Sequence, residues 1–326
     1  MLTNRTRFAS YLITSLILAL IVFQGCDFGD IKPKSTTGDL SVTADETLKK
    51  LMLEEEKEFE RLNKEANIEL KFLPTRYVTA ELINGDVRFV VTTGGLTPEE
   101  QKAADEHGIK INQHEFAVDG IAFIVNPNNP IERVTSDDLK KIFTGEYKQW
   151  SNVVSQSEEQ NRLLNSTMTG QNSNIKVVIQ RPNSDIYSYV KDTVLSGLDY
   201  SAQAVICSTS AQMLEEIRNN ENAIGISNLG WLGTGNQDLL DSTVKPLRVA
   251  RIYPDGFKAD FKQFHQGLVF NSEYPYRRVV YLLTTDQGIA LSTGFITFLL
   301  NKDGQKVVLK EGLVPVTQPI RTVQIN

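Results

Sequence analysis

The side chains that most often bind metals are scarce in this chain of 326 residues. It has three histidines and two cysteines, which are too few and too scattered for a zinc site of the usual Cys/His kind. His107 and His114 are seven residues apart, and Gly108 interrupts the predicted helix between them. The sequence therefore predicts no metal site and no cofactor.

Motifs for nucleophilic or nucleotide chemistry are also incomplete. Gly225-Ile226-Ser227 is the nearest approach to a nucleophile elbow, but Leu229 stands where the second glycine is required. Gly230, Gly233 and Gly235 lack the spacing of a nucleotide-binding loop. Catalytic triads are assembled in space, so the residues alone leave an enzyme open. Because no motif favours catalysis, we expect a protein that is not an enzyme.

Composition narrows the class of protein and partner. With 40% hydrophobic and 23% charged residues, the chain is an ordinary globular protein rather than a disordered or collagen-like one. Its net charge is −6, and no basic stripe is visible, so no nucleic acid partner is expected.

The N-terminus resembles the signal peptide of a lipoprotein. Arg5 and Arg7 precede an uncharged run of 13 residues, 11–23, which is too short to span a membrane and suits a signal peptide. Gly25 and Cys26 follow, and we expect cleavage of residues 1–25, lipidation of Cys26 and a linker over 26–40. A plain secretory signal, an uncleaved anchor and a disulfide between Cys26 and Cys207 are the alternatives.

Strands and helices alternate along the rest of the chain. Helical spacing of apolar residues predicts a helix over 45–66, and capping boxes predict helix starts at Thr97 and Thr135. Buried-type strands are predicted over 117–126 and 176–181, the second followed by a helix over 184–198. This alternation predicts an α/β fold with mainly parallel sheets.

Several segments together resemble the phosphate-binding component of phosphate ABC transporters, in its lipoprotein-type branch. The most specific match is VTSDDLKKIFTGEYKQWSNV, over 134–153. The others are AVDGIAFIVNPNNP (117–130), NAIGISNLGWL (222–232), YPYRRVVYLL (274–283) and the C-terminal segment 294–316.

The resemblance implies a two-lobed fold of the periplasmic-binding-protein type II, with two crossover strands. Lobe one would comprise 41–124 and 247–326, and lobe two 125–246. A ligand would bind between the lobes, where helix N-termini offer free N–H groups to an oxyanion.

The resemblance also implies which residues bind the ligand. They lie in three loops that open helices, and they are Thr43, Asp45, Glu46, Thr92, Thr93, Arg181, Asn183, Ser184 and Asp185. Asn183 and Asp185 replace glycines of the family's ligand loop. A carboxylate at Asp185 repels a dianion unless it accepts the ligand's proton, and we expect Asp45 to be the principal acceptor of that proton.

The expected function is that of an extracytoplasmic, lipid-anchored and monomeric solute-binding protein that captures phosphate and delivers it to an ABC permease. The alternative is a related surface or sensor lipoprotein that has lost phosphate binding and engages another ligand or protein.

The anchor prediction is tested by Cys26→Ala. Without the cysteine that carries the lipid, the protein should move from the membrane to the soluble extracytoplasmic fraction, as fractionation and immunoblotting would measure. Retention of the variant on membranes washed with high salt would contradict lipidation as the tether.

Overall fold

The computed structural model describes residues 35–233, 240–253 and 255–317. The predicted signal peptide, most of the predicted linker and Cys26 lie outside these ranges. The strands are β1 (Thr37–Asp45), β2 (Glu65–Leu73), β3 (Phe89–Thr93), β4 (Asn112–Val125), β5 (Arg133–Thr135), β6 (Lys176–Gln180), β7 (Val205–Cys207), β8 (Ala223–Asn228), β9 (Lys245–Pro246), β10 (Arg248–Ala250), β11 (Arg277–Thr284) and β12 (Val314–Pro315).

The α-helices are α2 (Lys49–Leu62), α3 (Thr75–Asn84), α4 (Pro98–Glu106), α5 (Ser136–Phe143), α6 (Glu158–Thr167), α7 (Asp185–Thr193), α8 (Ser210–Asn219), α9 (Leu229–Leu232), α10 (Gln266–Phe270), α11 (Leu291–Leu300) and α12 (Lys302–Lys310). Short 3-10 turns form η1 (Glu46–Leu48), η2 (Trp150–Asn152) and η3 (Gly170–Ser173).

Most of the described strands form one continuous sheet. Its order is β2-β1-β3-β11-β4-β8-β6-β7, and β12 and β9 also pair with β4. The outer strands are parallel as predicted, since β1 pairs in parallel with β2 and β3, and β6 with β7 and β8. The two central strands, β4 and β11, are antiparallel to each other and to their outer neighbours.

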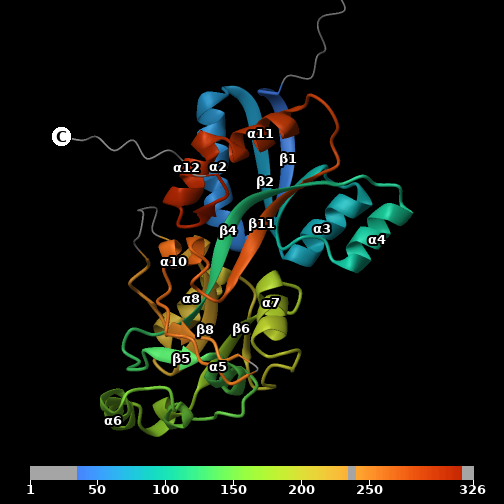
Figure 1. Cartoon of the computed structure of the whole chain (residues 1–326). Helices are drawn as coiled ribbons and strands as arrows, with labels where there is room; N and C mark the ends of the chain where they lie inside the picture. Colours follow the sequence, from blue (N-terminus) through green and yellow to red (C-terminus); the bar gives the residue numbers. More distant parts are fainter. Residues whose placement is uncertain (1–34, 234–239, 254, 318–326) are drawn as a thin grey trace, which may run out of the picture. The chain divides into compact units, whose positions relative to one another are not determined.

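Strand β4 joins the two halves of this sheet. Its first part, up to Gly120, pairs with β11, and its second part, from Ile121, pairs with β8. Residues 116–125 are buried without interruption, as an apolar strand covered on both faces requires. The chain passes through the junction again in β11, so two adjacent strands connect the halves (Figure 1).

Three clusters of buried hydrophobic side chains fill the halves. The largest contains residues of β6, β8, α5, α7 and α8 together with the second part of β4. The other two lie on opposite faces of the sheet that contains β3. Val91 and Val90 are neighbours in β3 but belong to different clusters, because successive strand residues point to opposite faces.

Residues from 247 to 276 lie with the half that contains β6 and β8. Leu247, Val249 and Phe264 belong to the largest cluster, and β10 pairs with β5. The strand that returns the chain to the other half is β11, which begins at Arg277. The sequence analysis predicts this return to lobe one at residue 247, before β11 begins.

Local signals located some elements better than others. The capping boxes at Thr97 and Thr135 are present at the starts of α4 and α5. The sequence analysis predicts no helix at α3, whose N-cap is Pro74, because a proline can end a strand as well as precede a helix. Strand β1 begins at Thr37, inside the segment predicted as linker.

Phe295 tests the hydrophobic core of the half that contains β1 and β3. Its side chain is fully buried, and its ring centroid lies 5.0 Å from that of Phe59 and 6.1 Å from that of Phe89. Phe295→Ala should lower the free energy of unfolding by about 3–5 kcal/mol, because it leaves a cavity among these rings. Denaturant titration measures the change. Phe257→Ala, at a ring that is 63% exposed, is the control and should cost much less.

Candidate functional site

The two central strands carry a buried ion pair at the junction of the halves. Arg278 of β11 and Asp119 of β4 are direct partners in the strand register. The Arg278 Nη2 and Nε atoms donate to Asp119 Oδ2 at 2.9 and 3.2 Å. Side-chain exposure is only 3% for Arg278 and 0% for Asp119, so water does not screen the pair.

Asp119 also accepts hydrogen bonds from the last residue of β8 and from the residue that follows it. Asn228 Nδ2 donates to Asp119 Oδ2 at 2.8 Å, and the Leu229 N–H donates to Asp119 Oδ1 at 3.1 Å. Both oxygens of this buried carboxylate are therefore occupied, which fixes its orientation toward Arg278.

The Arg278 guanidinium contacts three separate elements. Besides Asp119, it donates through Nη2 to Thr47 Oγ1 in η1 at 3.0 Å and through Nη1 to Asp185 Oδ2 at the start of α7 at 2.8 Å. Burial alone would lower the pKa of the guanidinium, but the carboxylates of Asp119, Asp185 and Asp45 raise it above its usual value. Arg278 is thus a permanent positive charge at the meeting point of the halves.

Asp45 organises the loop between β1 and η1. Its Oδ1 accepts from the Thr47 N–H at 2.7 Å, and its Oδ2 accepts from the Thr75 hydroxyl and, at 3.4 Å, from the Thr93 hydroxyl. Thr75 Oγ1 in turn accepts from the Asp185 N–H at 3.3 Å. Three of the predicted ligand residues, Asp45, Thr93 and Asp185, therefore lie in one hydrogen-bonded group.

Glu46 bridges the halves at a second point. Its carboxylate accepts from the Ser210 N–H at 3.0 Å and from the Ser210 hydroxyl, also at 3.0 Å, at the N-terminus of α8. Burial raises the pKa of Glu46, and the hydrogen bonds from Ser210 act in the opposite direction. The carboxylate takes the place that an anion would hold at this helix start.

The other predicted residues are used differently. Thr43 donates to Glu81 Oε2 at 2.8 Å, and the buried Thr92 hydroxyl donates to the Thr93 carbonyl at 3.4 Å. Ser184 is the N-cap of α7, where its hydroxyl accepts from the Tyr187 N–H at 3.3 Å.

Arg181 and Asn183 remain available to a ligand. Within the part of the chain that the structure describes, the half-buried Arg181 guanidinium makes no ion pair, and Asn183 Oδ1 is buried without a hydrogen-bond donor.

The sequence analysis did not assign three members of the site, which are Arg278, Asp119 and Thr75. Arg278 was quoted only as part of a matching strand, although its spacing from Tyr274-Pro275 was the available signal. Asp119 was likewise quoted only as part of a matching segment, 117–130, and its role in the structure is that of an ion-pair partner. Thr75 was missed because α3 was not predicted.

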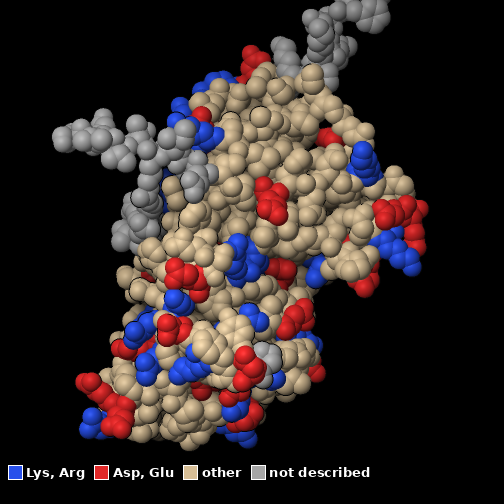
Figure 2. All heavy atoms as spheres, viewed as in Figure 1, with Lys and Arg blue, Asp and Glu red and all other residues tan. Residues whose placement is uncertain are grey.

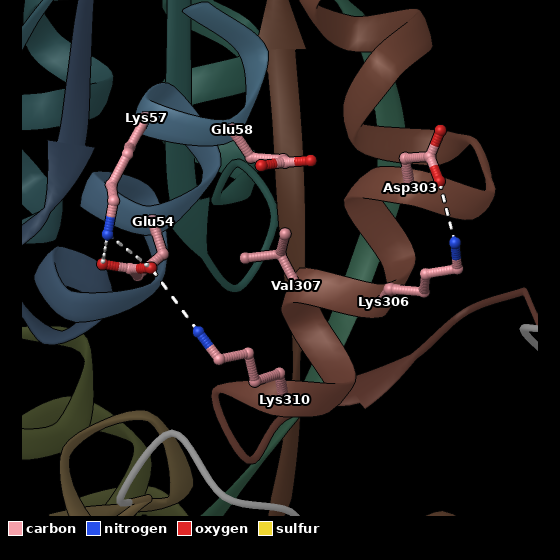
Figure 3. Close-up of a pocket in the computed structure, with 7 residues that line it drawn as sticks. All are labelled: Glu54, Lys57, Glu58, Asp303, Lys306, Val307 and Lys310. Atoms are coloured by element: carbon pink, nitrogen blue, oxygen red, sulfur yellow. Dashed lines mark hydrogen bonds and ion pairs between the residues drawn. The ribbon is translucent and has the colours of Figure 1, made fainter. Parts of the chain in front are cut away.

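A surface pocket of about 340 Å³ lies apart from these residues, between α2 and α12 (Figure 3). Most of its charged side chains pair with one another, since Lys57 and Lys310 lie 3.1 and 3.6 Å from Glu54 and Lys306 lies 3.0 Å from Asp303. Glu58 pairs instead with Arg61, outside the pocket. None of the predicted ligand residues lines it. On the face drawn in Figure 2, basic and acidic side chains are interspersed rather than gathered by sign.

Comparison with known proteins identifies relatives along most of the chain. A profile described as the PBP superfamily domain matches residues 32–303. The phosphate-binding proteins PstS of Pseudomonas aeruginosa and Bacillus subtilis are each 24% identical over 87% of this chain, covering 85% and 83% of the relatives.

A solved structure of a phosphate ABC transporter substrate-binding protein from Clostridium perfringens, described as putative and with bound phosphate, has a TM-score of 0.68. It is 22% identical and covers 86% of this chain and all of that one. The predicted two-lobed α/β fold is confirmed.

Asp119→Ala tests the ion pair. Removal of this carboxylate leaves a buried guanidinium without its main partner, so the free energy of unfolding should fall by about 3–5 kcal/mol. Denaturant titration measures it, and Asp192→Ala, at an exposed position of α7, should change stability by no more than about 0.5 kcal/mol. Equal effects of the two substitutions would contradict the assigned role of Asp119.

Proposed function

The chain belongs to the PBP superfamily, and from this premise we propose that it is an extracytoplasmic solute-binding protein that captures phosphate between its lobes and delivers it to an ABC permease. The observation that carries the proposal is the convergence of α3, α7 and Arg278 at one point between the halves. Two helix N-termini and a fixed positive charge are the groups that recognise an oxyanion. The names of the relatives favour phosphate among oxyanions.

The arrangement of strands supports ligand capture by hinge motion. Among the residues that the structure describes, only β4 and β11 pass directly between the halves, and the contacts across the site are polar. We propose that the lobes meet within these strands, near residues 120 and 277, so that 247–276 moves with lobe two. Ligand would then close the lobes by bending this pair of strands.

The proposed ligand contacts are those of the sequence-based prediction that lie near this point. Asp45 and Thr93 lie beside the start of α3, and Arg181 and Ser184 lie in the loop before α7. Arg181 makes no ion pair among the described residues, although its charge acts on the Glu46 carboxylate, so its guanidinium can bind an added anion.

Lipid anchoring through Cys26 is part of the proposal and rests on the sequence pattern. Across 35–233, 240–253 and 255–317, no helix combines the length and the apolar character that crossing a membrane requires.

A second candidate function is that of a sensor or surface lipoprotein that no longer binds phosphate. The observation that favours it is the excess of acidic groups, because Asp45, Asp119 and Asp185 surround one buried arginine. Such a site repels a dianion unless a carboxylate accepts the ligand's proton.

Calorimetric titration of ligand-stripped protein with phosphate and with sulfate tests the proposed function. Phosphate should bind and sulfate should bind far more weakly, because only hydrogen phosphate can donate a proton to a carboxylate. Arg181→Ala should weaken phosphate binding by about tenfold or more, the loss of one charge-assisted hydrogen bond. Arg162→Ala, at an exposed position of α6, is the control. Absence of heat with both anions would support the second candidate instead.

A further inference from the structure

Asp185 reaches across the site from one half to the other. It is the first residue of α7, whose Ile186 and Val190 belong to the largest hydrophobic cluster. Its Oδ2 accepts from Arg278 Nη1 at 2.8 Å, and its N–H donates to Thr75 Oγ1 at 3.3 Å. Thr75 begins α3 in the opposite half. The side chain is 16% exposed, so this contact is largely shielded from water.

The carboxylate fits because Gly94 has no side chain. A Cβ built on Gly94 would lie 3.2 Å from Asp185 Oδ1, closer than most such contacts. Gly94 also has a φ of +73°, a left-handed conformation that glycine adopts readily. The loop between β3 and α4 therefore leaves a space beside Arg278 that is filled by a carboxylate of the protein itself.

The N–H groups of Arg278 divide into two sets. Nε and Nη2 are held by Asp119 and Thr47 within the junction, which fixes the plane of the guanidinium. Nη1 points to Asp185. Nη1 can therefore bind a ligand anion while Nε and Nη2 keep the ion pair with Asp119.

We propose that Arg278 is an anion-binding residue of this site and that the Asp185 carboxylate occupies its Nη1 position as an internal competitor, holding the halves together until a ligand anion displaces it. This inference rests on the proposed function for the identity of the anion. Burial raises the pKa of Asp185, and Arg278 and, to a smaller extent, Arg76 oppose that rise, so the negative charge of the carboxylate depends on these cations.

An internal competitor has two measurable consequences. The apparent affinity for the ligand equals the intrinsic affinity multiplied by the fraction of molecules in which Asp185 has released Arg278. The contacts of Asp185 with Arg278 and Thr75 also link the halves of the ligand-free protein. Removing the charge of Asp185 should change both properties in predictable directions.

The experiment compares Asp185→Asn with Asp192→Asn, which makes the same charge change at an exposed position of the same helix. Asp185→Asn should tighten phosphate binding by at least about tenfold in calorimetric titration, since it removes a charge-assisted competitor for Nη1. Small-angle scattering without ligand should show a larger radius of gyration for this variant. Asp192→Asn should resemble the unaltered protein in both measurements.

Asp45→Asn separates competition from simple repulsion. It removes a nearby carboxylate that makes no ion pair with Arg278 among the described residues. Competition predicts a larger gain in affinity at Asp185 than at Asp45 and expansion only at Asp185. Equal gains at the two positions without expansion would overturn the inference.

The outcomes also separate this inference from the proposed function. If the unaltered protein binds phosphate and Asp185→Asn binds it equally or more weakly, Asp185 is no competitor and the proposed function stands. If neither protein binds phosphate, the proposed function fails, and the inference fails as well unless the ligand-free variant expands.

Discussion

Arg278 and Asp119 face each other in adjacent central strands with almost no access to water. A buried charge is costly unless it is paired and its remaining hydrogen-bonding groups are satisfied. Each requirement is met by a different element, with Thr47 from η1, Asn228 from β8 and Asp185 from α7. The positions of the loops around the site therefore follow from the need to satisfy this one pair.

The contacts that close the site are hydrogen bonds and ion pairs rather than hydrophobic packing. Glu46 with Ser210 and Asp185 with Arg278 can exchange their partners for water or for a ligand at modest cost. Almost all members of each hydrophobic cluster, in contrast, belong to a single half. The proposed hinge motion would therefore exchange polar contacts and leave most of the hydrophobic packing intact.

The fold was largely predictable from the sequence, and the site only in part. Capping boxes at Thr97 and Thr135 are local signals, and both marked true helix starts. Asp45 and Asp185 were expected near a ligand, and they do lie in one hydrogen-bonded group. The partnership of Arg278 with Asp119 could not be derived, because it depends on the register between strands 159 residues apart. Thr75 was lost because one proline can end a strand or begin a helix.

The position of β11 between β3 and β4 has a consequence for synthesis. As the chain emerges, β3 and β4 are made long before the strand that must lie between them. Until residue 284 has been made, both strands present unpaired edges, and the first half of the sheet cannot close. Such edges are prone to pair with other chains. The edges of β3 and β4 are therefore protected from aggregation only once about fifty further residues, which begin with β11, have been made. A chain that ends before β11 should need a chaperone to remain soluble.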